Sequence, residues 1–410
     1  MKNESGLHKK ILFVSQYFYP EVFRGNDIAF DLVQKGHNVT VITGTPNYPH
    51  GKFFEGYGIF KRSREKVKGV NVIRLPIIPR GNGSKYQLLF NYLSFAIVGS
   101  FYGFYISFRK KFDLIFVQQL SPVTMSLPAI VVKKLQKIPM YLWVLDLWPE
   151  SLISAGGYDN KFILGFFDVF VKLQYNNAEK ILVSSKGFVN FIEKKGKNKS
   201  KIMYFPNWAE AVFNDTPVHK IPKLPDGFLV MFAGNIGECQ DFDNVMKAAK
   251  ELSNIKDIHF IILGEGRKKD NAIKFVKENK LNKTVHFLGR YPISDMPSFF
   301  SAASVMLVSL KDDLVFNATA PAKLQAYMAA GKPVIGMLNG DGANIIKDAQ
   351  CGISVPAGNY NLLAQAILNM RKMSQNKLSE LGNNGKNFCR LHFDKEKCLN
   401  HLCDIMGLRF

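Results

Sequence analysis

Residues 10–43 read KILFVSQYFYPEVFRGNDIAFDLVQKGHNVTVIT, and this stretch decides the fold. Two short apolar and β-branched runs, Lys10–Ser15 and Asn38–Thr43, flank a segment with helical periodicity at about Asn26–Lys35. Gly36 follows that segment at the position where glycine commonly ends a helix. Strands that alternate with helices predict a parallel sheet in which the helices serve as crossover connections.

The same alternation continues along the chain in two series. With 410 residues the chain is longer than one hydrophobic core usually serves, so two domains are expected. The first series fills residues 1–205, and its later predicted strands are Val70–Leu75, Leu114–Gln118, Met140–Leu145 and Lys180–Ser184. The fold class is therefore α/β, with Rossmann-like, doubly wound domains.

A linker is predicted at residues 206–227, which are rich in proline and turn-forming residues. The second series occupies residues 228–384, with predicted strands Phe228–Ala233, His259–Leu263, Val285–Leu288, Val305–Val308 and Pro333–Ile335. Predicted helices in this half include Phe242–Leu252 and Ala322–Ala330. The last residues, about 379–406, are predicted to form one or two helices.

The composition points to anionic partners in a reducing compartment. Lys and Arg number 54 against 33 Asp and Glu, which gives a net charge of +21. This surplus suits anionic lipid or phosphorylated substrates, although a lysine-rich solvated surface produces the same count. No helix-turn-helix, zinc-finger or aromatic RNA-binding pattern is found, so we expect no nucleic-acid partner. Five cysteines without framework or metal-type spacing predict reduced thiols in the cytoplasm and no metal site.

One uncharged stretch bears on membranes. Residues 88–108 read LLFNYLSFAIVGSFYGFYISF, 21 residues without a charge, with Lys85 before them and Arg109, Lys110 and Lys111 after them. The length permits a membrane span, but a span would separate two predicted strands of one sheet. We therefore favour a helix that lies in the interface of an anionic membrane, with a buried core helix as the alternative.

Loops that follow the predicted strands of the second half carry residues suited to an activated phosphate compound. In an open α/β sheet, ligands bind outside the carboxyl ends of the strands. Glycines there let backbone N–H groups approach an anion, arginine can hold a diphosphate with two parallel hydrogen bonds, and lysine in a first helical turn lies beside free N–H groups. The alternative is that these glycines form ordinary turns and that the arginine lies on the surface without a ligand. The candidates are Gly234, Asn235, Ile236, Gly264, Gly266, Arg290, Tyr291, Pro321, Ala322 and Lys323.

The loops of the first half supply a second set of candidates. Asp146 ends a predicted strand beside Trp148, so its carboxylate is expected over the cleft between the domains, with helix capping as the alternative. The residues expected around it, as acceptor ligands, are Arg24, Asn26, Asp27, Tyr48 and Trp148.

The order of motifs over about residues 10–370 resembles that of bacterial family 4 glycosyltransferases, and is similar to the O-antigen and capsule enzymes that add N-acetylated amino sugars, including L-fucosamine transferases. The motifs are YFYPE, RGND, GHNVTVIT, PNYPHGKF, DLWPES, FAGNIG, GEG, FLGR and PAKLQAYMAAGKPVIG. The resemblance implies the GT-B fold, in which two Rossmann-like domains face each other across a cleft. It also implies that the last helix, about residues 385–410, crosses back onto the first domain.

The resemblance further implies a retaining transfer from a UDP-sugar donor, held by the second domain, to an undecaprenyl-diphosphate-linked saccharide, held by the first. No cofactor or metal is implied, and the setting is the cytoplasmic face of the inner membrane, to which the protein would attach peripherally. Asp146 and Lys323 are the expected catalytic residues. Asn344 stands where a third family acid often lies, and Ala318 and Ala326 replace two usual glutamates. A GT-B nucleotide-sugar epimerase and a non-catalytic protein that binds nucleotide or anionic lipid are the alternative functions.

Overall fold

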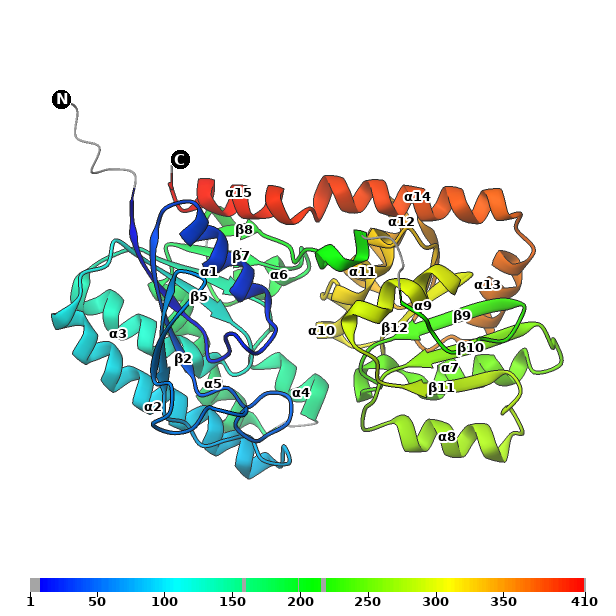
Figure 1. Ribbon diagram of the computed structural model, residues 1–410, viewed down its shortest axis with the longest axis horizontal. Helices are drawn as coiled ribbons and strands as arrows, with labels where there is room; N and C mark the ends of the chain where they lie inside the picture. The colour runs from blue at the N-terminus through cyan, green and yellow to red at the C-terminus, as the bar shows by residue number, and fades with distance from the viewer. Residues whose placement is uncertain (1–7, 157–159, 198, 215–218, 409–410) are drawn as a thin grey trace.

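The computed structural model describes residues 8–156, 160–197, 199–214 and 219–408. These residues form two lobes that lie side by side, each built on one sheet covered by helices (Figure 1). The prediction of two successive parallel α/β units is confirmed.

The sheet of the first lobe has eight strands in the order β3-β4-β2-β1-β5-β6-β7-β8, of which only the edge strand β3 is antiparallel to its neighbour. The strands are β1 Lys10–Val14, β2 Asn38–Gly44, β3 Arg64–Val67, β4 Val70–Leu75, β5 Leu114–Gln119, β6 Met140–Val144, β7 Lys180–Val183 and β8 Ile202–Tyr204. The α-helices are α1 Arg24–Gln34, α2 Lys85–Arg109, α3 Leu127–Gln136, α4 Glu150–Gly156, α5 Lys161–Asn177 and α6 Phe188–Lys194, with a short 3-10 helix, η2, at Val123–Ser126.

The sheet of the second lobe has six parallel strands in the order β11-β10-β9-β12-β13-β14. The strands are β9 Phe228–Ala233, β10 Ile258–Leu263, β11 Val285–Gly289, β12 Val305–Ser309, β13 Val334–Met337 and β14 Gly352–Val355. The α-helices are α7 Phe242–Glu251, α8 Lys269–Glu278, α9 Met296–Ala302, α10 Leu314–Asn317, α11 Ala322–Ala329, α12 Gly340–Asp348, α13 Tyr360–Arg371 and α14 Gln375–His392.

Burial on both faces explains why the central strands read as continuous apolar runs rather than as alternating ones. In β1, Leu12 and Val14 join the core cluster on one face of the sheet, and Ile11 and Phe13 join the cluster on the other face. All four side chains are completely buried. A parallel strand with helices on both sides needs apolar residues at every position.

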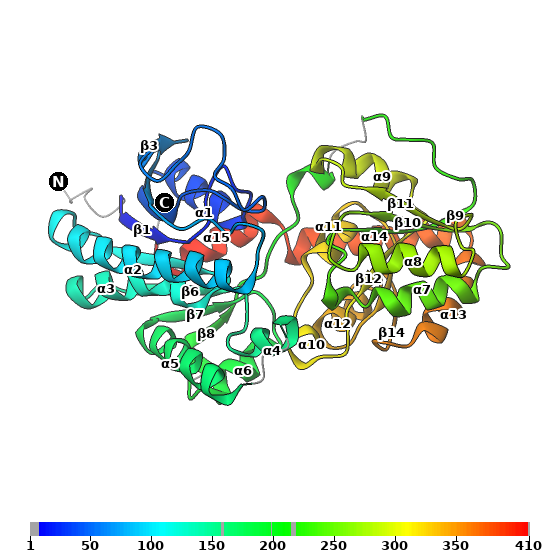
Figure 2. The ribbon, with the colours of Figure 1, turned by 90° about the horizontal axis from the view of Figure 1, so that it is seen from below.

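The tail returns from the second lobe to the first. Helix α14 runs along the second lobe, and α15, Lys395–Ile405, continues across to the first (Figure 1); the view from below also places α15 against the first lobe (Figure 2). Cys398, Leu399, Leu402 and Cys403 of α15 belong to the same apolar cluster as β1 and α1. The tail therefore contributes to the cores of both lobes, and all five cysteines are free.

Three strands of the structure, β3, β8 and β14, were not among the predicted ones. Strand β3 lies inside a run of basic residues and has no buried position, because it is the edge strand of its sheet. Strands β8 and β14 are also edge strands, of three and four residues, and are mostly half-buried. Strand β3 is polar and basic, and β8 and β14 are only three and four residues long, so each falls short of the apolar run that identified the central strands.

Helix α2 is the one helix, in the described part of the chain, that is long and apolar enough to cross a membrane by length and composition alone. It connects β4 and β5, which belong to the same sheet, and it packs against α3. One third of its most apolar window is buried in the protein, and aromatic side chains cover its outer face. The fold thus places α2 along the lobe as a crossover helix with an exposed apolar side.

Candidate active site

A cavity of about 880 Å³ opens between the two lobes and is lined by both. On the side of the first lobe the lining comes from the loops after β1 and β2 and includes Pro20, Glu21 and Tyr48. On the side of the second lobe it includes most of the predicted donor ligands. These are Gly234, Asn235, Gly264, Gly266, Arg290, Tyr291, Ala322 and Lys323. The cavity therefore lies at the carboxyl ends of β9, β10 and β11, where ligands of parallel sheets bind.

Lys323 is the cation at the centre of this lining. Its ammonium donates a hydrogen bond to Oε1 of Gln240 and lies 3.9 Å from the ring centroid of Phe232. Burial lowers the pKa of Lys323 to about 7. Among the described residues no carboxylate oxygen lies within 4.0 Å of Nζ. A desolvated ammonium that lacks a carboxylate is a natural partner for a ligand anion.

The glycines of the cavity wall allow two loops to touch. Gly264 has a φ of +135°, and a Cβ at this position would lie 1.9 Å from the carbonyl oxygen of Gly234. Only glycine permits both the backbone conformation and the close approach. The loops after β9 and β10 therefore present bare backbone to the cavity, immediately beside Lys323.

Glu21, on the opposite wall, was not predicted as a site residue. Its Oε1 accepts hydrogen bonds from the backbone N–H groups of Asn47, at 2.8 Å, and Tyr48, at 2.7 Å. The residue is 2% exposed, and its Oε2 has no hydrogen-bond partner within the described residues. Burial raises the pKa of this carboxyl group to about 7. The available signal was an acid inside the aromatic and proline-rich stretch YFYPE after the first strand.

Two further carboxylates line the cavity and were also missed. Glu210 forms an ion pair with Arg24 at 2.6 Å, and Glu265 forms one with Lys269 at 2.6 Å. Within the described residues, no group of three or more His, Cys, Asp or Glu side chains is arranged to hold a metal ion.

Three predicted acceptor ligands are engaged within the protein and do not line the cavity. Nε of Arg24 donates to the carbonyl oxygen of Trp208 at 3.0 Å. Asn26 is buried, and its amide bonds to backbone groups of the preceding loop. Asp27 accepts from Nε1 of Trp208, at 3.0 Å, and from Nζ of Lys395, at 2.7 Å. The reason is local: the first turn of α1 is where the connector and the tail are attached, so these polar groups hold them in place.

Asp146 and Trp148 form a separate hydrogen-bonded group at the end of β6. The carboxylate of Asp146 accepts from the hydroxyl groups of Ser121 and Ser151 and from Nε1 of Trp148, the last at 3.2 Å. Trp148 is 6% exposed, and its ring packs against that of Phe167 with centroids 5.0 Å apart. Neither residue is part of the lining of the 880 Å³ cavity, in contrast to Tyr48.

The remaining donor candidates lie outside the cavity. Ile236 is completely buried in the core of the second lobe. Pro321 is the residue before α11, where its ring fixes the start of the helix. Asn344 is exposed on α12 and is not brought to the cavity wall. As donor ligands these three residues stay predictions, which the lining of the cavity does not support.

The two alanines at the positions where the resemblance implies glutamates, Ala318 and Ala326, have different surroundings. Ala326 lines the cavity, whereas Ala318 is buried at the contact between the lobes. A Cβ on Gly187 of the first lobe would lie 2.6 Å from the Cα of Ala318. Beside them, Oδ2 of Asp341 accepts from the hydroxyl group of Ser185, at 2.5 Å, and from the N–H of Gly187, at 2.7 Å. The lobes therefore meet closely next to the cavity.

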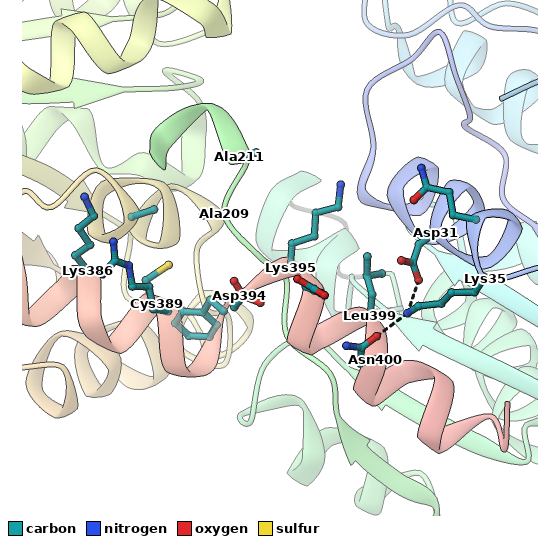
Figure 3. A pocket seen from close by; sticks show the side chains of 15 residues that line it. Asp31, Lys35, Ala209, Ala211, Lys386, Cys389, Asp394, Lys395, Leu399 and Asn400 are labelled. Carbon is teal, nitrogen blue, oxygen red and sulfur yellow. Dashed lines mark hydrogen bonds and ion pairs between the residues drawn. The ribbon is translucent and has the colours of Figure 1, made fainter. Parts of the chain in front are cut away.

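A second cavity, of about 460 Å³, lies where α14 passes into α15, between the tail, α1 and the connector. Figure 3 shows Asp31, Lys35 and Asn400 around it. Lys35 pairs with Asp31 at 2.9 Å and bonds to Asn400 at 2.7 Å. None of the predicted site residues lines this cavity, and its position identifies it as a gap at the junction of lobes and tail.

Comparisons with known proteins agree with this geometry. Residues 215–388 match the family described as glycosyl transferases group 1. The protein WcaI of Escherichia coli strain K12, whose name assigns it to colanic acid biosynthesis as a glycosyl transferase, is 29% identical over 251 residues. That alignment covers 58% of this chain and 60% of WcaI, so the match spans well under two thirds of the relative.

Solved structures match over nearly the whole chain. Sucrose-phosphate synthase from Thermosynechococcus elongatus has a TM-score of 0.74 at 16% identity, covering 97% of this chain and 98% of that one. Anabaena HepE in complex with UDP has a TM-score of 0.68 at 14% identity, covering 97% and 99%. The chain thus has the GT-B fold of two Rossmann-like domains, and its residues 215–388 carry the sequence pattern of group 1 glycosyl transferases.

Proposed function

We propose that the protein is a glycosyltransferase that takes a sugar from a UDP donor and acts in the synthesis of a surface polysaccharide. The observation that carries the proposal is Lys323, a partly buried cation without a carboxylate partner, in the cavity between the lobes. The family pattern in the second lobe supports sugar transfer. The UDP bound to HepE and the name of WcaI support the donor and the pathway class.

In the proposed reaction the second lobe neutralises the leaving group. The bond between the anomeric carbon and the diphosphate oxygen breaks, and negative charge develops on UDP. Lys323 and Arg290, which line the cavity, and the N–H groups at the start of α11 would stabilise that charge. Lys323→Ala should lower the transfer rate by roughly 2–4 kcal/mol in barrier height, as the loss of an oxyanion donor does.

The finer proposal is a retaining transfer of an N-acetylated amino sugar, such as N-acetyl-L-fucosamine, to a saccharide linked to undecaprenyl diphosphate. The acceptor oxygen bonds to the anomeric carbon on the face that UDP leaves. The hydroxyl proton passes to an oxygen of the departing diphosphate. No metal takes part in this scheme, because fixed positive groups do the neutralising.

We further propose that the protein attaches peripherally to the cytoplasmic face of the inner membrane. Aromatic side chains stand out from α2 and α5, among them Phe90, Phe108 and Phe162, which is 90% exposed. Basic residues flank α2, so the surface suits the anionic interface of a bilayer. Flotation with liposomes that contain anionic lipid tests this: the wild type should float, and Phe90→Asp with Phe108→Asp should remain at the bottom. Equal flotation of both proteins would contradict the attachment.

The transfer itself is tested with radiolabelled UDP-sugars and a lipid-diphosphate-linked saccharide. A labelled lipid product supports the glycosyltransferase. An isomerised UDP-sugar without a lipid product would show that the protein is an epimerase. Binding of the UDP-sugar without any turnover would show that it is a non-catalytic nucleotide-binding protein. A screen of UDP-N-acetylhexosamines for thermal stabilisation should precede the assay, because it selects the donor.

A further inference from the structure

An apolar groove, distinct from both cavities described above, runs over the first lobe between α2 and α5, with α3 as its floor. Its volume is about 780 Å³. Its lining is almost entirely carbon, and Leu93, Ile97, Leu127, Val131 and Phe167 are representative. These helices lie together on the lower side of the first lobe in Figure 1. An exposed groove of this kind takes an apolar ligand, and its shape along a helix suits a chain.

Arg80 lies between this groove and the cavity that holds Lys323. Its guanidinium donates to the hydroxyl oxygen of Tyr17 at 2.8 Å and lies 5.1 Å from the ring centroid of Tyr48 and 5.9 Å from that of Tyr92. Within the described residues no carboxylate oxygen lies within 4.0 Å of this side chain. Arg80 is therefore held in position by tyrosines, and its charge is available to an anion.

The residues around Arg80 connect the two hollows. Tyr48 lines the cavity between the lobes, and Tyr92 lines the apolar groove. Pro122 also lines the groove, directly after Ser121, whose hydroxyl group bonds to Asp146. One molecule with an apolar chain, an anionic group and a sugar would meet, in that order, the groove, Arg80 and the cavity.

We propose that the groove between α2 and α5 binds the hydrocarbon chain of the acceptor lipid, and that Arg80 binds its diphosphate. This inference rests on the proposed function, since it names where that acceptor lies. It commits to the acceptor's own chain and not to bulk membrane lipid, because Arg80 lies against both Tyr92 of the groove and Tyr48 of the cavity. Under this assignment the length of the acceptor's hydrocarbon chain affects binding. The exposed aromatic side chains outside the groove serve a separate role, attachment to the membrane.

The binding test uses geranylgeranyl diphosphate below its aggregation concentration, with isothermal titration calorimetry on the full chain. Inorganic diphosphate and geranylgeraniol are the two half-probes, and both should bind at least tenfold more weakly. Arg80→Met should raise the Kd for geranylgeranyl diphosphate at least tenfold, with partial rescue by Arg80→Lys. Ser100→Phe, which fills the groove, and Ile97→Asp, which places a charge at a position 54% exposed, should do the same. Leu135→Asp on α3, exposed and outside the groove, is the matched control and should bind as the wild type does.

Absence of binding, or binding that the Arg80 and groove variants leave unchanged, would overturn the inference whatever the enzyme catalyses. A transfer assay in detergent-free solution tests the lipid-binding groove separately from the proposed glycosyltransferase activity. With one saccharide diphosphate on a five-carbon and on a twenty-carbon isoprenoid, the wild type should show a KM at least tenfold lower for the longer chain. Ile97→Asp should remove most of that difference by raising the KM for the longer chain, and Leu135→Asp, outside the groove, should keep it. Transfer with equal KM values for both chains would overturn the groove and leave the glycosyltransferase standing. Binding with no transfer would sustain the site and refute the function.

Discussion

The pH dependence of donor binding tests the role of Lys323 directly, because the pKa of this residue lies near neutrality. Burial lowers that pKa to about 7 in the free protein. A diphosphate beside Nζ favours the charged form and raises the pKa again. Binding should therefore take up a proton at any pH where the free protein holds Lys323 neutral.

The size of the effect follows from the two pKa values. With a pKa of about 7, roughly nine tenths of the ammonium is charged at pH 6 and roughly one tenth at pH 8. If the complex keeps Lys323 charged throughout, the affinity for UDP-N-acetylglucosamine should fall about tenfold over this range, or about 1.4 kcal/mol. The sign is fixed: the bound form has the higher pKa, so binding is strongest below pH 7 and weakens as the pH rises through it.

Calorimetry in two buffers of different protonation enthalpy measures the proton uptake. We expect about 0.9 proton at pH 8 and about 0.1 at pH 6. The donor is a diphosphate diester whose own charge stays constant over this range, so the proton is taken up by the protein and supplied by the buffer. Lys323→Arg, which is always charged, should bind with constant affinity and take up no proton, and Lys323→Met should bind weakly at every pH. A wild type that matches the arginine variant would refute the lowered pKa of Lys323, and a Lys323→Met variant that binds as the wild type does would refute the placement of diphosphate there.

Other predictions follow from single contacts. Glu21→Gln should raise the free energy of unfolding by about 1–3 kcal/mol at pH 8 and by little at pH 4.5. The pKa of Glu21 in the folded protein, about 7, exceeds its value in the unfolded chain, so the wild type loses stability as the pH rises from 4.5 to 7. Urea unfolding in which the gain of Glu21→Gln over the wild type does not depend on pH would contradict this. Gly264→Ala should cost about 2–4 kcal/mol in the same experiment, because a Cβ would lie 1.9 Å from the oxygen of Gly234, and a neutral result would show that the loops can separate. Asp341→Ala removes the acceptor for the N–H of Gly187, so small-angle scattering should give a larger radius of gyration with an unchanged circular dichroism spectrum; an unchanged radius would mean that this contact does not hold the lobes together.

The central architecture was predictable from sequence, because parallel strands with both faces buried give unmistakable apolar runs. Strand β1 and the helix after it were identified within about two residues by that signal together with Gly36. The edge strand β3 could not be found in this way: its residues lie in a basic run, and what makes it a strand is pairing with β4. The local sequence pattern does not predict such pairing between strands.

The candidate site was predictable mainly on the wall of the second lobe, and on the wall of the first lobe only Tyr48 was predicted. Loops after strands of a parallel sheet must converge, so Gly264, Arg290 and Lys323 could be grouped from their positions alone. The loops after β1 and β2 converge in the same way, but the polar residues of the first lobe near α1 are divided between the cavity and the attachment of connector and tail. The sequence does not distinguish the carboxylates of Asp27 and Glu21, yet Asp27 bonds to Lys395 of the tail and Glu21 lines the cavity.

The substitution of glutamate by Ala318 has a steric counterpart in the contact between lobes. Gly187 of the first lobe approaches so closely that its added Cβ would lie 2.6 Å from the Cα of Ala318, and Asp341 accepts the N–H of Gly187 at 2.7 Å. A glutamate at residue 318 would place a second carboxylate at the buried contact where the N–H of Gly187 already bonds to Asp341. The carboxylates that line the cavity come instead from Glu21 and from the connector and loop residues Glu210 and Glu265. Because Glu21 belongs to the first lobe and Glu265 to the second, a ligand that contacts both acids must lie in the cavity while the two lobes are in contact.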